Sequence, residues 1–314
     1  MRLSNEEIKK IVFGAVNVEC QEDGLRFYKC TEKQIKAWYK LRTDLGERSE
    51  TTTGITIDFH TDSKKITFVV SGSKFEILIN GNLTAQYNYE DNDEVHEINV
   101  SMPEGENRCT LVFPSHFIGV LKSLEIDDGA CIKPHPFDMK MLFIGDSITQ
   151  GWNSKYDCLS FAHRTAAVFN AERVINGIGG AFYHPTTFDK PEFDPDVVIV
   201  AYGSNDFLVS PCAEELQRNV SGYLQQIKQV YGNKKVFVII PTYRFDRSET
   251  AMGTYDECRE IIAKEAEKYE FPIIDGYDMM PHHMDFYDDT IHPIDLGFGI
   301  YAEKLVLKLR KWFN

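Results

Sequence analysis

The sequence predicts an α/β protein in which a parallel sheet, covered by helices on both faces, follows an all-β sandwich. Three observations lead to this prediction. In the second half, short apolar runs alternate with longer helical patterns, which is typical of a parallel sheet. In the first half, short runs with period-two alternation are separated by turn residues. A turn-rich segment with two prolines at 127–136 separates the patterns, so we expect domains at 1–135 and 136–314.

The expected elements of the first half are mostly short strands. Asn80-Gly81 lies between the runs Phe75–Ile79 and Leu83–Tyr87 and predicts a two-residue hairpin, because both turn positions need positive φ. Short strands separated by turns favour a sandwich or a jelly roll. The other expected elements are a short helix at Thr31–Leu41 and strands at Gly54–His60, Lys65–Val70, Arg108–Phe113 and Val120–Ile126.

The expected elements of the second half alternate between strand and helix, and ligands in such sheets bind at the carboxyl ends of the strands. Polar residues just after these strands are therefore the candidates for a site. Strands are expected at Lys140–Ile144, Arg173–Ile175, Val197–Ala201, Lys235–Ile240 and Pro272–Ile274. Helices are expected near Cys158–Phe169, Ala213–Val230, Thr254–Tyr269 and Leu296–Trp312.

Composition excludes several classes of partner. The 314 residues include 34 basic and 48 acidic side chains, and the net charge of −14 argues against a nucleic-acid or anionic-membrane partner. No apolar run reaches the roughly 20 residues that span a bilayer. The first residues lack the apolar segment of a signal peptide, so we expect a cytoplasmic protein. Its seven cysteines contain no Cys-x-x-Cys pair and are expected to be reduced thiols.

The segment Met141–Gly151 contains the first candidate for catalysis. A buried strand ends at Gly145-Asp146-Ser147, so Ser147 is expected at the rim of the sheet, where a hydrolase nucleophile belongs. A serine at this place in a strand-to-helix turn is also a common helix cap. We expect the carboxylate of Asp146 to bond backbone N–H groups of the turn, which is a structural role.

The other parts of a serine hydrolase follow downstream, each after a strand or before a helix. The glycines of Asn176–Gly180 would let a backbone N–H approach a substrate. Asn205, after another strand, could donate its side-chain amide to an oxyanion. Asp289 precedes His292 by three residues in a loop, a spacing that can bring the carboxylate to the imidazole Nδ1.

Gly-Asp-Ser, the glycine-rich segment, Gly-x-Asn-Asp and Asp-x-x-His-Pro, in this order, resemble the four conserved blocks of the SGNH/GDSL hydrolases. The resemblance covers the second half and implies a flavodoxin-like, three-layer α/β/α fold. By position it implies Ser147 as nucleophile, His292 as general base and Asp289 as the group that orients the base. It also implies an oxyanion hole formed by the N–H groups of Ser147 and Gly180 and the side chain of Asn205. Gly179 remains an alternative to Gly180 as oxyanion donor, and Asp288 remains an alternative to Asp289 as the partner of the imidazole.

The first half resembles the amino-terminal β-sandwich of carbohydrate esterase family two and related bacterial deacetylases, in its layout and in the segment Gly54–Ser63. This resemblance implies a bacterial serine esterase that removes acetyl groups from carbohydrates through an acyl-enzyme. The expected substrate is a small-molecule or oligosaccharide ester, and no cofactor is needed. A lipid or thioester hydrolase of the same fold and an inactive carbohydrate-binding protein are the alternatives. A homodimer formed through the sandwich also stays open.

Further residues beside these motifs could contact the substrate. Flanking aromatic side chains are more often part of a core. A metal site is not expected, because the cluster of His282, His283, Asp285 and Asp288 lacks a recognised ligand spacing. The candidate substrate-binding residues are Trp152, Tyr183, Tyr202, Phe207 and Arg244.

Overall fold

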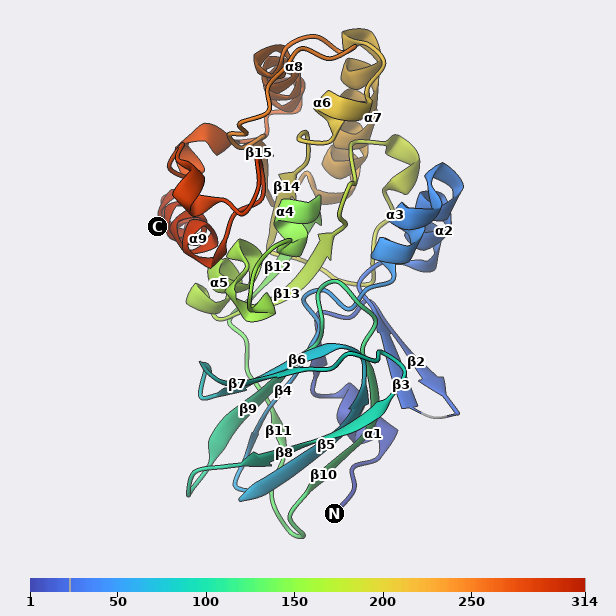
Figure 1. The fold of residues 1–314 in the computed structure, drawn as a ribbon, viewed down its shortest axis with the longest axis vertical. Coiled ribbons are helices and arrows are strands. Elements are labelled where there is room, and N and C mark those ends of the chain that lie inside the picture. Colours follow the sequence, from blue (N-terminus) through green and yellow to red (C-terminus); the bar gives the residue numbers. More distant parts are fainter. Residues whose placement is uncertain (23, 314) are drawn as a thin grey trace.

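A computed structural model describes residues 1–22 and 24–313. Two antiparallel sheets form one end of the molecule, and a parallel sheet between helices forms the other (Figure 1). The predicted fold class is therefore confirmed. In the described part of the chain, no helix combines the length and the apolar character needed to cross a membrane.

The two antiparallel sheets belong to the first 135 residues and pack face to face over one apolar core. Inward-facing residues of both sheets form this core, among them Phe59 of one sheet and Phe68 of the other. One sheet has the order β1 (Val12–Phe13), β4 (Thr56–Thr61), β9 (Asn107–Val112), β6 (Lys74–Ile79) and β7 (Asn82–Asn88), with β11 (Lys133–Pro134) paired to β4. The second has the order β2 (Asn17–Gln21), β3 (Gly24–Tyr28), β10 (Val120–Ile126), β5 (Lys65–Ser71) and β8 (Val95–Ser101).

The sequence pattern located some of these strands and missed others. Asn80 and Gly81 have φ of 51° and 79°, as the predicted hairpin between β6 and β7 requires. Strands β1, β2, β3, β8 and β11 were not predicted. β2 and β8 are largely exposed strands that carry few apolar residues, so local hydrophobicity gives a weak signal for them.

The parallel sheet has the strand order second, first, third, fourth and fifth along the chain, which is the flavodoxin-like order. Its direction of winding therefore changes between the first and third strands, and ligands of such sheets bind at the carboxyl end of that point. The strands in spatial order are β13 (Ala171–Gly177), β12 (Met139–Gly145), β14 (Val197–Ala201), β15 (Lys235–Ile240) and β16 (Ile273–Asp275).

Helices cover both faces of the parallel sheet (Figure 1). The apolar faces of α7 (Ala213–Tyr231) and α8 (Tyr255–Lys268) pack on one side, and those of α5 (Phe161–Val168) and α9 (Asp295–Arg310) pack on the other. These four helices match the predicted ones within a few residues. The remaining α-helices are α1 (Asn5–Lys9), α2 (Glu32–Leu41), α3 (Thr43–Ser49), α4 (Ser147–Gln150) and α6 (Asp206–Val209).

Helices α2 and α3 lie in the first half of the sequence but pack against the α/β part. The predicted helix α2 begins with a capping box between Thr31 and Gln34. Trp38 of α2 and Leu45 of α3 are fully buried in the same core as α7 and α8. Residues from the first half thus reach the layer that carries the candidate site, and the division at residue 135 stays a prediction.

Candidate active site

Ser147 is the first residue of helix α4, directly after the buried strand β12. The Asp146 carboxylate caps this helix by accepting a hydrogen bond from the backbone N–H of Ile148 at 3.0 Å, as expected from the sequence. Burial raises the pKa of Asp146 to about 7. Helix α4 lies against the end of β13, where a Cβ on Gly177 would come 2.5 Å from the backbone nitrogen of Gln150. Glycine is therefore required for this close contact.

The structure brings Ser147, His292 and Asp289 into one hydrogen-bonded chain. The Oγ of Ser147 lies 2.8 Å from Nε2 of His292, and Nδ1 of the same ring lies 2.7 Å from Oδ2 of Asp289. Ser147 is 145 positions from His292 in the sequence, and the histidine lies in the loop before α9. With the Nδ1 proton directed to the carboxylate, Nε2 is free to accept the serine proton.

The Asp289 carboxylate is fixed by its own loop. Its Oδ1 accepts hydrogen bonds from the backbone N–H groups of Ile291 at 2.8 Å and His292 at 2.7 Å. Partial burial alone would raise the pKa of Asp289, but these bonds and the bond from the imidazole lower it below its ordinary value. The alternative residue Asp288 is exposed, and its backbone N–H donates to the carbonyl of His292. The geometry therefore favours Asp289 as the partner of the imidazole.

The three candidate oxyanion donors follow the first three strands of the sheet. The Asn205 amide donates one hydrogen to the carbonyl of Ala181 at 3.0 Å and has a second hydrogen to give. The N–H of Gly179 already donates to Oε1 of Gln150 at 2.6 Å, so it is occupied. The N–H of Gly180 has no hydrogen-bond partner within residues 1–22 and 24–313. Of the two glycines, Gly180 is the one able to serve as a donor.

Trp152 is the one predicted substrate-binding residue that lies beside the triad. Its half-buried ring lies 6.2 Å from the ring of His292, measured between centroids. The ring of His116 meets it edge-on at 4.8 Å, and the guanidinium of Arg48 lies 5.6 Å from its centroid. Burial lowers the pKa of His116 to about 4, so this neighbour is uncharged at neutral pH. Residues of the first half thus form part of the surroundings of the triad.

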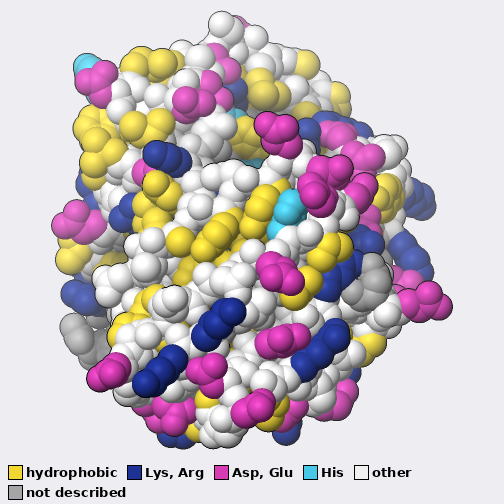
Figure 2. Space-filling model, turned by 60° about the horizontal axis from the view of Figure 1, so that its bottom comes forward, with side chains coloured by type: hydrophobic (Ala, Val, Ile, Leu, Met, Phe, Trp, Pro, Cys, Tyr) yellow, Lys and Arg dark blue, Asp and Glu magenta, His cyan; other side chains and the backbone are white. Residues whose placement is uncertain are grey.

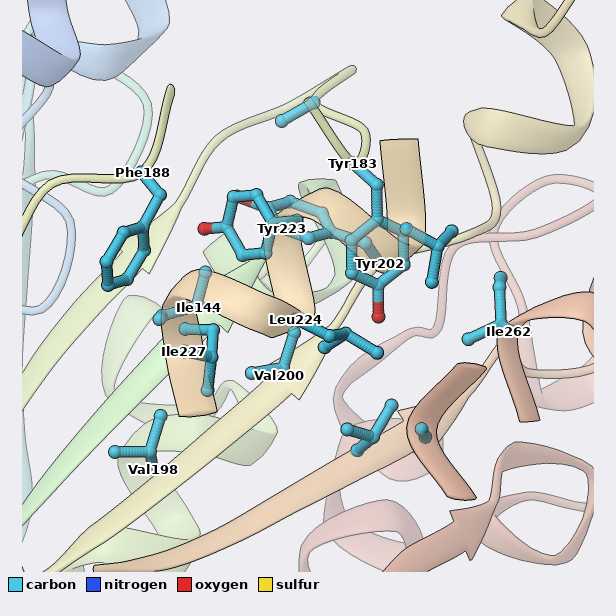
Figure 3. Packing of buried hydrophobic residues seen from close by; sticks show 14 of the residues in the cluster. Ile144, Tyr183, Phe188, Val198, Val200, Tyr202, Tyr223, Leu224, Ile227 and Ile262 are labelled. Atoms are coloured by element: carbon cyan, nitrogen blue, oxygen red, sulfur yellow. The ribbon is translucent and has the colours of Figure 1, made fainter. Parts of the chain in front are cut away.

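The other four predicted substrate-binding residues belong to the interior, which corrects the sequence-based expectation. Tyr183 and Tyr202 pack edge-to-face in the core, and Figure 3 shows them beside Tyr223 of α7. Phe207 packs on Tyr255 in the same core. Arg244 is buried and forms a bidentate ion pair with Asp246. Because these side chains are buried, they expose almost no surface to a substrate. Their position next to the motifs in the sequence could not show whether they belong to the core or to a pocket.

Three polar residues of the site were missed by the sequence analysis: Lys29, Arg48 and Gln150. Gln150 is buried in α4. Its Oε1 accepts a hydrogen bond from the N–H of Gly179, and its Nε2 donates to the carbonyl of Ser115 at 2.7 Å. Lys29 and Arg48 donate to carbonyl groups of the glycine-rich segment from more than 130 positions away. Nothing local in the sequence signals such distant contacts.

The described residues contain no group of three or more His, Cys, Asp or Glu side chains arranged to hold a metal ion. All seven cysteines are free. Acidic and basic side chains are interspersed on the face of the molecule in Figure 2. The described site consists of the serine, the imidazole, the carboxylate and the amide donors.

Comparison with known proteins agrees with this interpretation of the fold. Residues 143–300, half of the chain, match the model of the GDSL-like lipase/acylhydrolase family. No curated protein sequence gives a significant match. Three solved structures share the fold at low identity. The salicylyl-acyltransferase SsfX3 from a tetracycline biosynthetic pathway has a TM-score of 0.82 at 16% identity, covering 96% of this chain and 94% of that one.

The other two structures are esterases. A family two carbohydrate esterase from Clostridium thermocellum, in complex with cellohexaose, has a TM-score of 0.72 at 14% identity, covering 96% of this chain and 99% of that one. The acetyl xylan esterase Est2A from the rumen bacterium Butyrivibrio proteoclasticus has a TM-score of 0.66 at 15% identity, covering 83% and 90%. The likeness to these two extends over the sandwich as well as the parallel sheet.

Proposed function

This chain belongs to the GDSL-like lipase/acylhydrolase family, and from this premise we propose that it is a serine esterase that removes acetyl groups from carbohydrates. One observation carries the proposal: the hydrogen-bonded chain from Ser147 Oγ through His292 to Asp289, with links of 2.8 and 2.7 Å. The likeness to family two carbohydrate esterases and to an acetyl xylan esterase supports the choice of acyl group and of carbohydrate.

The proposed reaction is acyl transfer in two steps. His292 takes the proton of Ser147 as Oγ attacks the ester carbonyl, and the oxyanion accepts hydrogen bonds from the N–H groups of Ser147 and Gly180 and the amide of Asn205. The imidazolium, stabilised by Asp289, then gives its Nε2 proton to the ester oxygen of the sugar, the bond between this oxygen and the acetyl carbon breaks, and Ser147 is left acetylated. Water, deprotonated by His292, attacks the acetyl-enzyme, and release of acetate restores the free serine.

The test combines labelling with product analysis. A fluorophosphonate is expected to label Ser147 in the folded protein, and acetylated oligosaccharides should release acetate. The variant Ser147→Ala should lose both. Ser154→Ala is a matched control, because the hydroxyl of Ser154 donates to Oδ1 of Asp295 at 2.7 Å. This variant should be labelled like the wild type.

The outcomes separate the alternatives. Labelling without acetate release, but with turnover of acyl thioesters or long-chain esters, would indicate a lipid or thioester hydrolase. Absence of labelling in a folded sample that binds oligosaccharides would indicate an inactive carbohydrate-binding protein. Wild-type rates of acetate release from Ser147→Ala would remove Ser147 from the mechanism altogether.

A further inference from the structure

The glycine-rich segment after β13 is fixed by residues from the first half of the chain. Nζ of Lys29 donates to the carbonyl of Gly177 at 2.8 Å, and Nη1 of Arg48 donates to the carbonyl of Gly179 at 2.8 Å. Gln150 adds a third contact, because it accepts from the N–H of Gly179 and donates to a carbonyl of the first half. Hydrogen bonds from three different side chains thus hold the segment that carries the candidate oxyanion donor.

The contact of Arg48 bears directly on that donor. The carbonyl of Gly179 and the N–H of Gly180 belong to one peptide unit, which is trans, so the two groups point in opposite directions. A cation bound to the carbonyl therefore directs the N–H away from itself. A charge-assisted hydrogen bond to the carbonyl also polarises the peptide and makes the N–H a stronger donor.

The N–H of Ala181 donates to the carbonyl of Ile178 at 3.0 Å and closes a β-turn around the Gly179–Gly180 peptide, but such a turn can form with either orientation of its central peptide. Gly180 has φ of +84°, and the preceding residue is also glycine, so the peptide between them meets few steric limits on rotation. Arg48 by contrast is held in place. It pairs with Asp44 one turn earlier on α3 at 3.4 Å and lies over the ring of Trp152. Leu45 anchors the same helix in the α/β core.

We propose that Arg48 is a positioning residue of the oxyanion hole: it orients and polarises the Gly179–Gly180 peptide from outside the catalytic half of the chain. This inference rests on the proposed esterase function and deepens it. It gives the first half of the chain a role in catalysis that does not require contact with the substrate. Loss of the guanidinium should weaken stabilisation of the transition state while substrate binding is retained.

The experiment compares Arg48→Met with Arg42→Met on 4-nitrophenyl acetate. Arg42 is a matched control, because it pairs with the same Asp44 carboxylate at 2.9 and 2.6 Å and donates to no group of the glycine-rich segment. Removal of one whole oxyanion donor typically costs about 10²–10³ in rate. We expect Arg48→Met to lower kcat about 10- to 100-fold with KM within about twofold, and Arg42→Met to leave both unchanged.

Two further measurements distinguish positioning from general damage. An arylboronic acid, whose tetrahedral adduct with serine places an oxygen in the oxyanion hole, should bind Arg48→Met more weakly by the same factor as the loss in kcat/KM. Arg48→Lys keeps a cation and a donor and should recover part of the rate. The side chain of Arg48 is 36% exposed, so these variants should fold, which thermal melting will verify.

The outcomes distinguish this inference from the proposed function. If the wild type is no faster than Ser147→Ala, the esterase function fails and the role of Arg48 fails with it. If the wild type is active and Arg48→Met equals Arg42→Met, only the positioning role is overturned. The positioning role is likewise overturned if the loss appears in KM alone, or if boronate affinity stays at the wild-type value while kcat falls.

Discussion

At the scale of single residues, Asn205 has two amide hydrogens, and the hydrogen bond to the carbonyl of Ala181 uses one of them. The bond holds the side chain in place and leaves the second hydrogen for an oxyanion. Asn205→Ala should therefore lower kcat by about 10²–10³ with little change in KM. Steady-state kinetics on 4-nitrophenyl acetate will measure this, and a change confined to KM would contradict a role in the transition state.

The pair of Asp289 and Asp288 allows a matched comparison. Asn at position 289 can donate to Nδ1 of His292 and so stabilise the tautomer in which Nε2 is protonated and cannot act as base. Asp289→Asn should lower kcat by about 10⁴ at neutral pH. Asp288→Asn removes an exposed carboxylate next to it and should stay within about twofold of the wild type. Equal losses in the two variants would argue against a specific partnership of Asp289 with the imidazole.

At the scale of elements, the four-residue helix α4 joins the nucleophile to its surroundings. Its first residue is Ser147, and its last is the buried Gln150, whose side chain fixes the N–H of Gly179. This bond is also what distinguishes the two glycines, because it occupies one N–H and leaves that of Gly180 for an oxyanion. This short helix thus fixes the position of the nucleophile relative to the loop that carries the candidate oxyanion donor.

Gln150→Leu tests this connection. Leucine has a similar size but leaves the N–H of Gly179 and the carbonyl of Ser115 without their partner. An unpaired buried group costs roughly 1–3 kcal/mol, so the free energy of unfolding should fall by about that amount for each. Urea denaturation will measure it. Gln229→Leu, on the exposed face of α7, should change stability by less than about 0.5 kcal/mol, and an equal loss there would refute the assignment.

At the scale of the whole molecule, Lys29 connects the two halves of the chain. Its ammonium group is fully buried and donates to the hydroxyls of Thr51 and Thr53 at 2.7 and 2.8 Å and to the carbonyl of Gly177 at 2.8 Å. Burial lowers the pKa of Lys29 to about 7, against an ordinary value of 10.5. A group of this kind makes the free energy of unfolding depend on pH.

The direction of that dependence follows from proton binding. Between pH 7 and 10.5 the unfolded chain holds a proton on Lys29 that the folded protein has released, so rising pH favours the folded state. The free energy of unfolding of the wild type, relative to Lys29→Met, should rise by up to about 1.4 kcal/mol per pH unit across this range. Urea denaturation from pH 7 to 9 will measure the difference, and a flat or falling difference would contradict the assignment.

Much of the fold could be predicted from the sequence, because its signals are local. The turn at Asn80-Gly81, the capped start of α2 and the alternation of strands and helices depend on backbone preferences and hydrophobic periodicity over a few residues. The order of the polar motifs after the strands was also visible, since carboxyl ends of parallel strands meet at one edge. The nearness of Ser147, the glycine-rich segment and Asn205 follows from it. His292 and Asp289 reach the site from the loop before α9, and the catalytic roles stay predictions.

The tertiary structure alone decided which polar groups remain free and which side chains are buried. Flanking position marked Tyr183 and Arg244 as substrate contacts, but packing placed both in the interior. The choice of Gly180 over Gly179 depends on the bond between Gly179 and Gln150, which are 29 positions apart. The contacts of Lys29 and Arg48 join segments more than 130 positions apart. Such contacts carry no local pattern, because they arise only when the whole chain closes around its cores.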